Sequence, residues 1–545
     1  MYSASGKSGE FHYLCEMFLD STTVYTADED LSIQVSNTIG QFYEGRLPAE
    51  GTLHRSLGSF LEPNETVTSL SLHFDDQDGK LRKIFTEYTV ANRAVDVWVG
   101  EGVSKANYSK VFPGVVAHPN GVSWDDVSAT LTIIDKRLKA RKTLPLNKYT
   151  TDEYPDVESR AINLPVPIVY GDFSSAAEHP VQVRAWCIST TANRFKVSDC
   201  GLLGIDRYLK NAIRLSPSNI YNVSLSRGTF QVSTAVGAYD ATNDIMSVNC
   251  RGLYTANLTL IETPMGVAKN IYTAYMGLTG SDLHGTAFHA ADVETGTEKV
   301  RSILNTEIST ETVLGELLSE AKFDMRFVGG QYDPKARNLD LATARQDYRE
   351  SDIVISSDRQ EKAMFSVVRD PDRISTNKIK ARYAYDTIDA QYLGAYTYQL
   401  TSATEEVSAI LERPIDFNWY YQDAAVQTQV QREVAMFSTE PTQVDMTVTA
   451  RALLKNLADQ INLTYNVFDG EPFQIRNMEL DLASMTVRMG AFRYLDLGAG
   501  YWMSDAAPAW DDASASSRAI SGYWLDDSGY ATSTDTKSKN VSRWS

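Results

Sequence analysis

The chain alternates apolar and polar side chains in Ala94-Val-Asp-Val-Trp-Val-Gly100. In an extended strand this pattern places the three valines on one face and Asp96 and Trp98 on the other. A second strand pattern, Ala129-Thr-Leu-Thr-Ile-Ile-Asp135, follows after several Gly and Pro turn signals. This part of the chain therefore predicts a meander of short antiparallel strands.

Strand patterns return after a proline-rich stretch, Leu164-Pro-Val-Pro-Ile-Val-Tyr-Gly-Asp172. Its prolines remove ladder donors, so we expect an extended edge or linker there. Further along, Ile245-Met-Ser-Val-Asn-Cys-Arg251 places Met246, Val248 and Cys250 on one face. We therefore expect a second β domain in which Cys250 is a small buried apolar residue.

Two segments have the spacing of helices. In the first, Ser309 or Thr310 can cap a helix over 309–322, and an apolar stripe runs from Val313 to Ala321. In the second, over 424–436, three valines lie four residues apart. A clean alternation at 442–449 then predicts the return of strands.

The length of 545 residues predicts three to five domains at ~100–200 residues each. The fold class we expect is mainly β with an α+β part. The predicted division is an N-terminal β domain (1–160), a proline-rich linker (161–180), a second β domain (181–263), an α+β domain (264–385), a closing β-barrel domain with helix 424–436 (386–497) and a C-terminal docking extension (498–545).

The C-terminal extension is poor in aliphatic residues and rich in aromatic ones. It cannot bury enough aliphatic surface to fold alone, but its large amphipathic rings suit docking on a partner. A frayed tail is the alternative. The candidate partner-docking residues are Tyr501, Trp502, Trp510, Tyr523, Trp524 and Trp544.

Charge and composition exclude several classes of protein. The 70 acidic and 51 basic residues give a net charge of −19, which disfavours a general grip on nucleic acid. We expect no membrane span, because no apolar run approaches ~18–20 residues. The first residues lack a basic, apolar leader, so we expect assembly in the cytoplasm. The four scattered cysteines predict neither a disulfide framework nor a zinc ribbon.

Motifs that resemble binding sites are each incomplete. Gly6-Lys7-Ser8 lacks the upstream glycine and strand of a phosphate loop. Asp75-Asp-Gln-Asp-Gly79 opens like a calcium loop but lacks the acidic residue at its far end, so we expect a hairpin turn. A histidine–carboxylate cluster has neighbours that suggest a loop and does not align ligands on a helix. Its residues are His284, His289, Asp292 and Glu294.

Catalytic motifs are also missing. The chain has no G-x-S-x-G, and the acidic pairs Asp125-Asp126 and Asp511-Asp512 would point to opposite faces of a strand. The basic run Lys136-Arg-Leu-Lys-Ala-Arg-Lys142 suits an acidic surface of a neighbouring subunit or a solvated strand end. We therefore predict no catalytic, cofactor-binding or metal-binding residues and no enzyme activity.

Several stretches, in this order, resemble the hub proteins of tailed-bacteriophage tail tips and baseplates. The resemblance covers most of 85–495. It lies in Ala161-Ile-Asn-Leu-Pro-Val-Pro-Ile-Val-Tyr-Gly-Asp172, in Ser247-Val-Asn-Cys-Arg-Gly252 followed by Pro264 and the 309–322 helix, and in the 424–436 helix with the 442–449 strand, Leu457-Ala-Asp-Gln-Ile-Asn-Leu-Thr-Tyr465 and Phe473 to Gly490.

The resemblance implies antiparallel β-barrels of the phage tail hub type, two per chain, in a homotrimeric ring with pseudo-sixfold symmetry. Such a ring joins the sixfold tail tube to the threefold tip and fibres and forms the channel for genome ejection. It implies a virion tail-tip location, with a distal tail or tail tube protein, a tape measure protein and a tail fibre protein as partners.

The resemblance also implies that phage DNA passes through the lumen without specific binding, and we expect no cofactor. The cysteine-bound iron–sulfur cluster and fused cell-wall hydrolase of some related hubs are not expected, because this sequence lacks their motifs. Two alternatives remain open: a carbohydrate-active enzyme of the host envelope and a receptor-binding tail protein.

Overall fold

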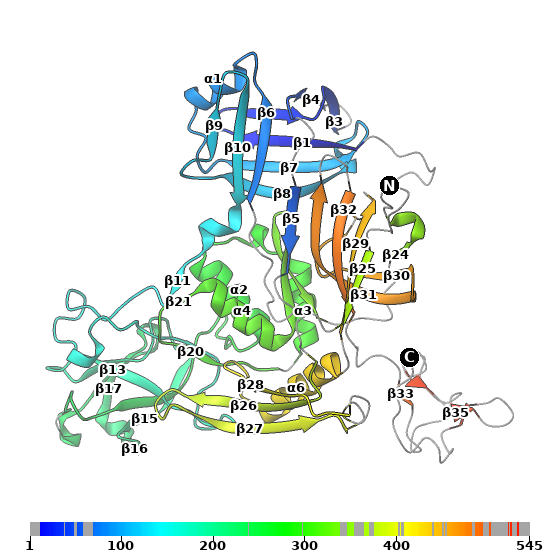
Figure 1. Cartoon of the computed structure of the whole chain (residues 1–545). Helices are drawn as coiled ribbons and strands as arrows, with labels where there is room; N and C mark the ends of the chain where they lie inside the picture. Colours follow the sequence, from blue (N-terminus) through cyan, green and yellow to red (C-terminus); the bar gives the residue numbers. More distant parts are fainter. Residues whose placement is uncertain are drawn as a thin grey trace.

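The computed structural model of the chain is mostly β (Figure 1), which confirms the predicted fold class. Its buried apolar residues form several separate hydrophobic cores. It describes residues 11–36, 39–47, 52–57, 69–237, 239–296, 298–337, 346–353, 365–369, 375–401, 404, 408–438, 441–449, 452, 455–481, 486–493 and four two-residue strands at 501–502, 521–522, 524–525 and 531–532.

The N-terminal strands form one curled sheet, which we call the first barrel. Its order is β3-β4-β2-β1-β7-β8-β10-β6, with β9 added to β10. The strands are β1 (Phe11–Phe18), β2 (Thr23–Ala27), β3 (Leu31–Ser36), β4 (Ile39–Gly45), β6 (Ser69–Asp75), β7 (Ala94–Glu101), β8 (Tyr108–Val116), β9 (Val122–Trp124) and β10 (Ser128–Asp135). Helix α1 (Lys80–Glu87) follows β6.

The first barrel closes between β2 and β6 through the residues after β4. The backbone N–H groups of Arg46 and Leu47 both donate to the carbonyl of Ala27, at 2.9 Å each. On the other side, the N–H of Asp75 donates to the carbonyl of Arg46 at 2.7 Å. The short segment after β4 therefore fills the place of a strand in the wall.

Strand β7 has the alternation that the sequence predicts. Val95, Val97 and Val99 are buried in the barrel core, while Trp98 packs in a smaller cluster on the outer face with Leu14 and Tyr43. The hairpin β3–β4 covers that outer face. Both faces of this part of the wall thus carry apolar packing, although the alternation in the sequence is typical of a sheet with one solvated face.

The second β domain forms a sheet of order β16-β15-β19-β13-β14-β18-β17 around its own core. Met246, Val248 and Cys250 all lie in this core, as predicted. The strands are β13 (Val183–Ser189), β14 (Arg194–Lys196), β15 (Gly204–Lys210), β16 (Ile213–Arg214), β17 (Ile220–Ser224), β18 (Thr229–Val232) and β19 (Met246–Arg251).

The proline-rich stretch is extended but contributes a short strand. The connecting pairs are β11 (Thr143–Leu144) with β21 (Ile308–Ser309) and β12 (Ile168–Tyr170) with β20 (Ser302–Leu304). The chain from the first barrel to the second β domain therefore runs along the helical part of the molecule.

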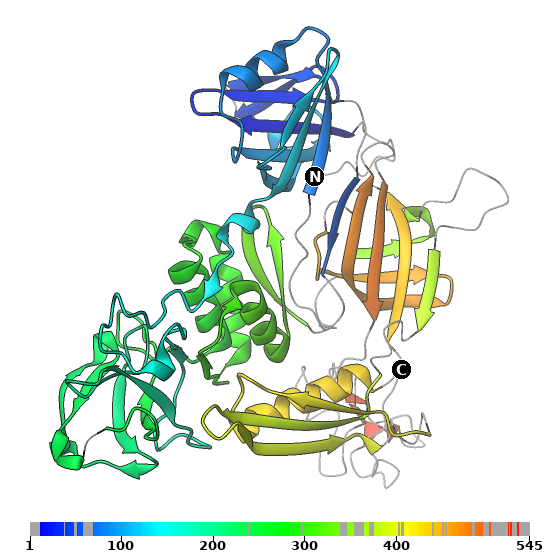
Figure 2. The same ribbon diagram turned by 60° about the vertical axis from the view of Figure 1, so that its left-hand side comes forward.

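The helical part packs α2 (Pro264–Asn270), α3 (Gly285–Thr295) and α4 (Thr310–Ala321) beside the hairpin β22 (Phe323–Val328) and β23 (Gln331–Ala336) (Figure 2). Ser309 caps α4 by accepting from the N–H of Thr312, as predicted. Lys322, with φ near 60°, ends α4 in the left-handed conformation and turns the chain into β22.

A small sheet shares the core of the helical part. Its order is β27-β26-β28, and α6 (Asp423–Phe437) packs on it. The strands are β26 (Lys378–Asp386), β27 (Gln391–Gln399) and β28 (Glu412–Asp416). The three valines of α6 are fully buried, so the predicted 424–436 helix is confirmed.

The C-terminal strands form a second curled sheet, the second barrel, of order β24-β30-β31-β32-β29-β25. A bridge between Ile353 and Val448 joins the end of the β24 segment to β29 and closes the wall. The strands are β24 (Gln346–Arg349), β25 (Phe365–Arg369), β29 (Thr442–Thr449), β30 (Gln460–Tyr465), β31 (Phe468–Asp481) and β32 (Thr486–Arg493). Beyond it, β33 (Tyr501–Trp502) pairs with β34 (Ser521–Gly522), and β35 (Trp524–Leu525) with β36 (Ala531–Thr532).

Candidate functional site

The two barrels are joined by a strand that leaves the first barrel and enters the second. Strand β5 (Thr52–Ser56) lies in sequence between β4 and β6, yet it pairs antiparallel with β31, from Thr52 opposite Asp481 to Ser56 opposite Asn477. The N–H of Leu57 extends the ladder by donating to the carbonyl of Arg476 at 2.8 Å. A strand from the N-terminal part of the chain therefore completes the sheet of the second barrel.

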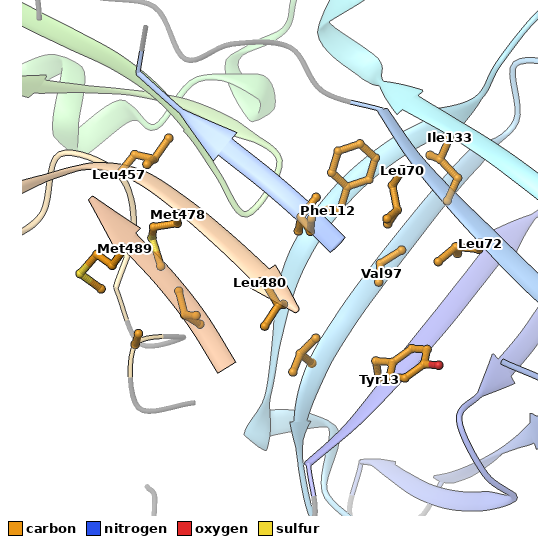
Figure 3. Close-up of a cluster of buried hydrophobic side chains, with 14 of the residues drawn as sticks. Tyr13, Leu70, Leu72, Val97, Phe112, Ile133, Leu457, Met478, Leu480 and Met489 are labelled. Atoms are coloured by element: carbon orange, nitrogen blue, oxygen red, sulfur yellow. The ribbon is translucent and has the colours of Figure 1, made fainter. Parts of the chain in front are cut away.

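One continuous hydrophobic core fills both barrels and the junction between them (Figure 3). Leu53 of β5 and Leu57 are buried in it. The labelled core residues come from the first barrel (Tyr13, Leu70, Leu72, Val97, Phe112 and Ile133) and from the second (Leu457, Met478, Leu480 and Met489). Because burying apolar surface stabilises by roughly 25 cal/mol per Å², a shared core makes the two barrels one cooperative unit.

A buried charge cluster fixes the second barrel to the β22–β23 hairpin. The carboxylate of Asp324, on β22, accepts from Arg337 Nε and from Arg476 Nη1 of β31, each at 2.7 Å. All three side chains are almost fully buried. Arg476 Nη2 also reaches the carbonyl of Leu57 at 3.4 Å. The cluster thus ties the hairpin, β31 and the crossing segment together.

The same hairpin contacts the rest of the junction through further cations. Arg326 pairs with Asp333 and donates to Asp459 Oδ1 of the second barrel at 2.5 Å. Arg55 of β5 donates to the carbonyl of Phe327 at 3.0 Å. Arg137, which follows β10, lies over the ring of Phe327. The hairpin therefore wedges against both barrels and β5.

A cavity of about 290 Å³ lies where β5, β8, β31 and the β22–β23 turn meet. Apolar side chains such as Leu53, Met478 and Leu480 line it together with Arg55, Lys110 and Lys455. Lys110 is paired with Asp96 at 2.6 Å. The junction is therefore packed around a small opening with basic groups on its wall.

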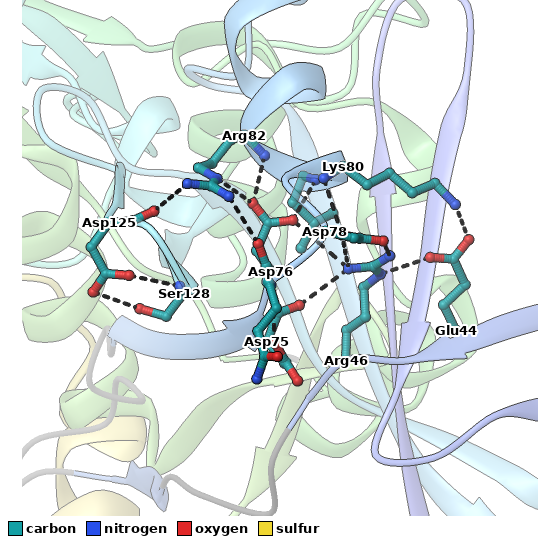
Figure 4. A network of polar contacts seen from close by, with 11 residues as sticks. Glu44, Arg46, Asp75, Asp76, Asp78, Lys80, Arg82, Asp125 and Ser128 are labelled. Carbon is teal, nitrogen blue, oxygen red and sulfur yellow. Dashed lines mark hydrogen bonds and ion pairs between the residues drawn. The ribbon is translucent and has the colours of Figure 1, made fainter.

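The closing seam of the first barrel carries the residues that resemble a calcium loop (Figure 4). Arg46 holds Asp78 through two hydrogen bonds of 2.9 and 2.6 Å, which keep the pKa of that carboxyl well below its usual range. Asp76 is fully buried and accepts from the N–H groups of Leu81 and Arg82. These acids therefore neutralise arginines and cap α1.

The turn expected at 75–79 is present, since the N–H of Gly79 donates to the carbonyl of Asp76 at 2.9 Å, but it leads into helix α1, so the expected hairpin is wrong. A helix begins here because the buried carboxylate of Asp76 accepts from the N–H groups of its first turn. Lys80 adds an ion pair to Glu44 across the seam. The network stabilises the closure of the barrel wall.

The histidine–carboxylate cluster is not brought together as a ligand set. The expected loop is wrong, since 285–295 forms helix α3. His284 precedes the helix and faces Asp333 at 3.4 Å, whereas Asp292 accepts from Thr263 at 3.2 Å. Burial raises the pKa of Asp292. Alanines and Phe288 give this helix an apolar face that turn-forming neighbours had masked in the sequence.

A different group of ligand-type residues meets instead, at the start of α6. In the part of the chain that the structure describes, one group of three ligand-type residues lies close enough together to hold an ion: Glu178, His179 and Asp423. His179 Nε2 lies 2.7 Å from Asp423 Oδ1, and Tyr383 donates to the same oxygen at 2.6 Å. These two bonds lower the pKa of Asp423. The 244 positions between His179 and Asp423 hide the pair from sequence reading.

The basic run pairs within the chain. Lys136 faces Asp282 at 3.4 Å, Arg137 pairs with Asp135, and Arg141 pairs with Glu311 at 2.7 Å. Lys136 and Arg141 therefore link the first barrel to the helical part, and contact of the run with a neighbouring subunit stays a prediction. Alternating charges fix this register inside one chain, as they do across interfaces.

The remaining candidates fall in three groups. Tyr501, Trp502 and Trp524 lie in the short C-terminal strands, and nothing is described of their side chains. Trp510, Tyr523, Trp544, Gly6-Lys7-Ser8 and Asp511-Asp512 lie outside the described residues. Asp125 accepts from the N–H groups of Val127 and Ser128 and closes a turn, while Asp126 approaches Arg82.

All four cysteines are free. Cys15, Cys187 and Cys250 are buried, and Cys200 is half-buried against the hydroxyl of Tyr275. Burial raises the pKa of Cys15 and of Cys187 to about 12. These thiols therefore stay protonated at neutral pH, and Cys250 is the small apolar core residue that the sequence predicts. In the described residues, no helix has the length and apolar character needed to span a membrane.

No protein-family model and no curated protein matches the chain. The chain is similar to proteins of phage tails and of a gene transfer agent. The 43 kDa tail protein of prophage MuSo2 from Shewanella oneidensis is 10% identical, with a TM-score of 0.38 and coverage of 89% of this chain and 98% of that one. A chain from the virion of a native gene transfer agent particle is 9% identical, with a TM-score of 0.38 and coverage of 60% and 84%.

Prophage tail protein gp18 from Listeria monocytogenes EGD-e is 11% identical, with a TM-score of 0.28 and coverage of 60% of this chain and 94% of that one. Two of these three neighbours are named as prophage tail proteins, and the third belongs to the virion of a gene transfer agent. The crossing strand β5 is the feature that sequence reasoning missed. The available signal was Leu53 and Leu57, which lie on one face of an extended segment, but nothing in it identifies a partner strand more than 400 residues away.

Proposed function

We propose that the chain is the structural hub of a phage tail tip or baseplate. Three copies form a ring that joins a sixfold tail tube to a threefold tip with its fibres. The ring surrounds the channel through which the genome leaves the particle. The chain performs no catalytic step in this role.

The pair of barrels held together by β5 carries the proposal. Each chain contributes two closed barrels with a common core, so a trimer contributes six β modules. A ring of six such modules matches a sixfold tube, while the remaining parts of the chain repeat three times. Closed symmetric rings are the common way in which homo-oligomers bury their interfaces.

The junction supports the proposal because it is rigid in the way a symmetry adaptor requires. A shared core, the β5 ladder and the buried Asp324 cluster hold the two barrels in one relative orientation. A flexible link would let the second barrel of each chain drift from the ring. Rigid placement of both barrels lets a single chain fill two of six positions.

Net charge supports a channel role for the ring. At −19 per chain, the trimer is strongly acidic, and a wall of that sign gives DNA no counterion-release gain on contact. Phage DNA therefore passes without specific binding. The tail tube or distal tail protein and the tape measure protein contact the ring, and the C-terminal extension contacts a fibre or tip protein through its tryptophans and tyrosines.

Native mass spectrometry of the purified full-length chain, together with cryo-EM of phage particles that carry it, tests the proposal. We expect the mass of three chains and a ring of six barrels at the tail tip. A stable monomer that is absent from the tail would overturn the proposal. Hydrolysis of peptidoglycan or polysaccharide by the purified chain, lost on replacement of one Asp or Glu, would support the enzyme alternative instead.

A further inference from the structure

Strand β27 is an open edge of the small sheet β27-β26-β28. In the described part of the chain it pairs with β26 alone, over Gln391–Gln399. Helix α6 covers one face of this sheet, so a further strand would have to lie beside β27 in the plane of the sheet (Figure 2). The strand is nine residues long, which is enough to hold a partner segment.

The outward-facing backbone groups of β27 can be assigned from the ladder. The N–H of Leu400 donates to the carbonyl of Asn377 at 2.9 Å, so this pair is a hydrogen-bonded one. In an antiparallel ladder such pairs alternate with non-bonded pairs. Counting back from Leu400, Tyr398 and Tyr396 are in hydrogen-bonded pairs with β26. The residues in the alternate positions, Leu393, Ala395 and Thr397, therefore direct their N–H and C=O groups away from β26. Within the described residues, no hydrogen bond to these outward backbone groups is recorded.

The two edges of the sheet differ in protection. Strand β28, on the opposite edge, carries Glu412, Arg413, Pro414 and Asp416 among its five residues. Charges and proline are the usual devices that keep an edge from pairing with another chain. Strand β27, with the sequence QYLGAYTYQ, has neither a charge nor a proline. One edge of the sheet is therefore guarded and the other is not.

The charges of β26 do not guard β27 either. Lys378 and Lys380 pair with Glu412, and Arg382 pairs with Asp416, all across to β28. The side chains of Leu393, Ala395 and Thr397 are exposed beside them. A strand added at this edge would lie next to the side chains of β27, which carry no charge, so a charge on the added strand would have no ion-pair partner on β27.

We propose that β27 binds an extended, uncharged segment of a neighbouring tail protein, which adds a strand to the sheet. The inference rests on the proposed function for the identity of that neighbour. Strand addition uses main-chain hydrogen bonds for affinity and alternate side chains for selectivity. Pairing of β27 with β27 of a second copy would place a twofold axis at the edge, and such an axis does not fit a ring of three.

Amide hydrogen exchange in the purified full-length chain and in assembled tails tests the inference. In the free chain, we expect fast exchange at Leu393, Ala395 and Thr397 and slow exchange at Tyr396 and Tyr398, whose N–H groups face β26. In tails, we expect the three outward amides to slow by about 100-fold. Equally fast exchange in tails that contain the chain would overturn the strand addition alone. Absence of the chain from tails would overturn the proposed function as well.

Variants at one position separate the edge from the fold. Ala395→Pro removes an outward N–H without touching the β26 ladder, Ala395→Lys guards the edge with a charge, and Ala395→Val keeps both the N–H and neutrality. We expect the proline and lysine variants to keep the melting temperature but to leave the amides of Leu393 and Thr397 unprotected in tails. The valine variant should match the wild-type chain.

Wild-type protection in tails with all three variants would overturn the inference. If Ala395→Pro fails to fold, Ala395→Lys gives the same test with the backbone unchanged. Protection of β27 in the isolated chain that rises with concentration and is lost in Ala395→Lys would assign the edge to self-pairing, and would overturn the assignment to a neighbouring protein.

Discussion

At the scale of single residues, burial and hydrogen bonding oppose each other at the carboxylates of the helical part. Burial raises the pKa of Glu320 to about 8, although the carboxylate accepts from the N–H groups of residues 418–420 at 2.8 to 3.2 Å. Glu433 is equally buried, but Lys322 and Arg413 outweigh burial and hold its pKa at about 2. The presence of a buried cation thus decides which of two buried acids is ionised.

The raised pKa of Glu320 predicts a pH-dependent stability. Because the folded chain keeps the proton and the unfolded chain releases it above pH 4.5, the free energy of unfolding falls between pH 4.5 and about 8, by up to about 1.4 kcal/mol per pH unit. Glu320→Gln cannot titrate, so its stability should be flatter over this range. Urea unfolding at pH 5, 6.5 and 8 measures the two slopes; parallel slopes would contradict the prediction.

The buried cluster around Asp324 predicts a large effect of one substitution. Asp324→Ala leaves Arg337 and Arg476 buried without their carboxylate, which costs about 3–5 kcal/mol of unfolding free energy. Asp78→Ala is the matched control, because it removes an exposed carboxylate that also binds an arginine through two bonds, so its effect on stability should be much smaller. Equal losses in chemical denaturation would show that burial of the cluster does not matter.

At the scale of elements, local patterns predict what a segment forms, and distant pairing decides where it goes. The alternation at 94–100 and the stripe from Val313 to Ala321 were sufficient, because each buries one face against a single core. Helix α3 was missed because glycines and threonines at its ends resemble a loop. The position of β5 depends on a strand near residue 480, and no local pattern encodes that separation.

The crossing of β5 predicts that damage to this strand weakens both barrels. Leu53→Ala removes a buried side chain from the shared core and should cost about 2–5 kcal/mol. His54→Ala, on the exposed face of the same strand, should change stability by less than about 0.5 kcal/mol. Native-state hydrogen exchange should show Cys15 in the first barrel and Met489 in the second losing protection together. Loss confined to one barrel would contradict the common unit.

At the scale of the whole molecule, the sequence predicts which segments build the hydrophobic cores better than it predicts how these segments meet. The sequence separates the aromatic C-terminal segment from these cores by composition alone. It could not place the junction or the charge cluster at Asp324, because each joins segments that are distant in sequence.

Removal of the C-terminal segment tests this division of the molecule. Because residues 498–545 are poor in the aliphatic side chains that build a core, deletion of this segment should leave the melting temperature of the remainder unchanged within about 2 °C. The particle should lose a fibre or tip protein, since large amphipathic rings dominate binding at protein interfaces.

A second variant separates the rings from the length of the segment. One full-length variant replaces the aromatic residues by Ala and should lose the same partner as the deletion; these residues are Tyr501, Trp502, Trp510, Tyr523, Trp524 and Trp544. A control variant with Asn in place of Asp511 and Asp512 should keep that partner. Composition of purified tails by mass spectrometry gives the readout. A fall in melting temperature comparable to the loss of a barrel would instead make the segment part of the folded core. If tails with the aromatic variant keep every tail protein, the aromatic rings do not bind the partner. The contacts that exclude water from that interface would then lie elsewhere on the chain.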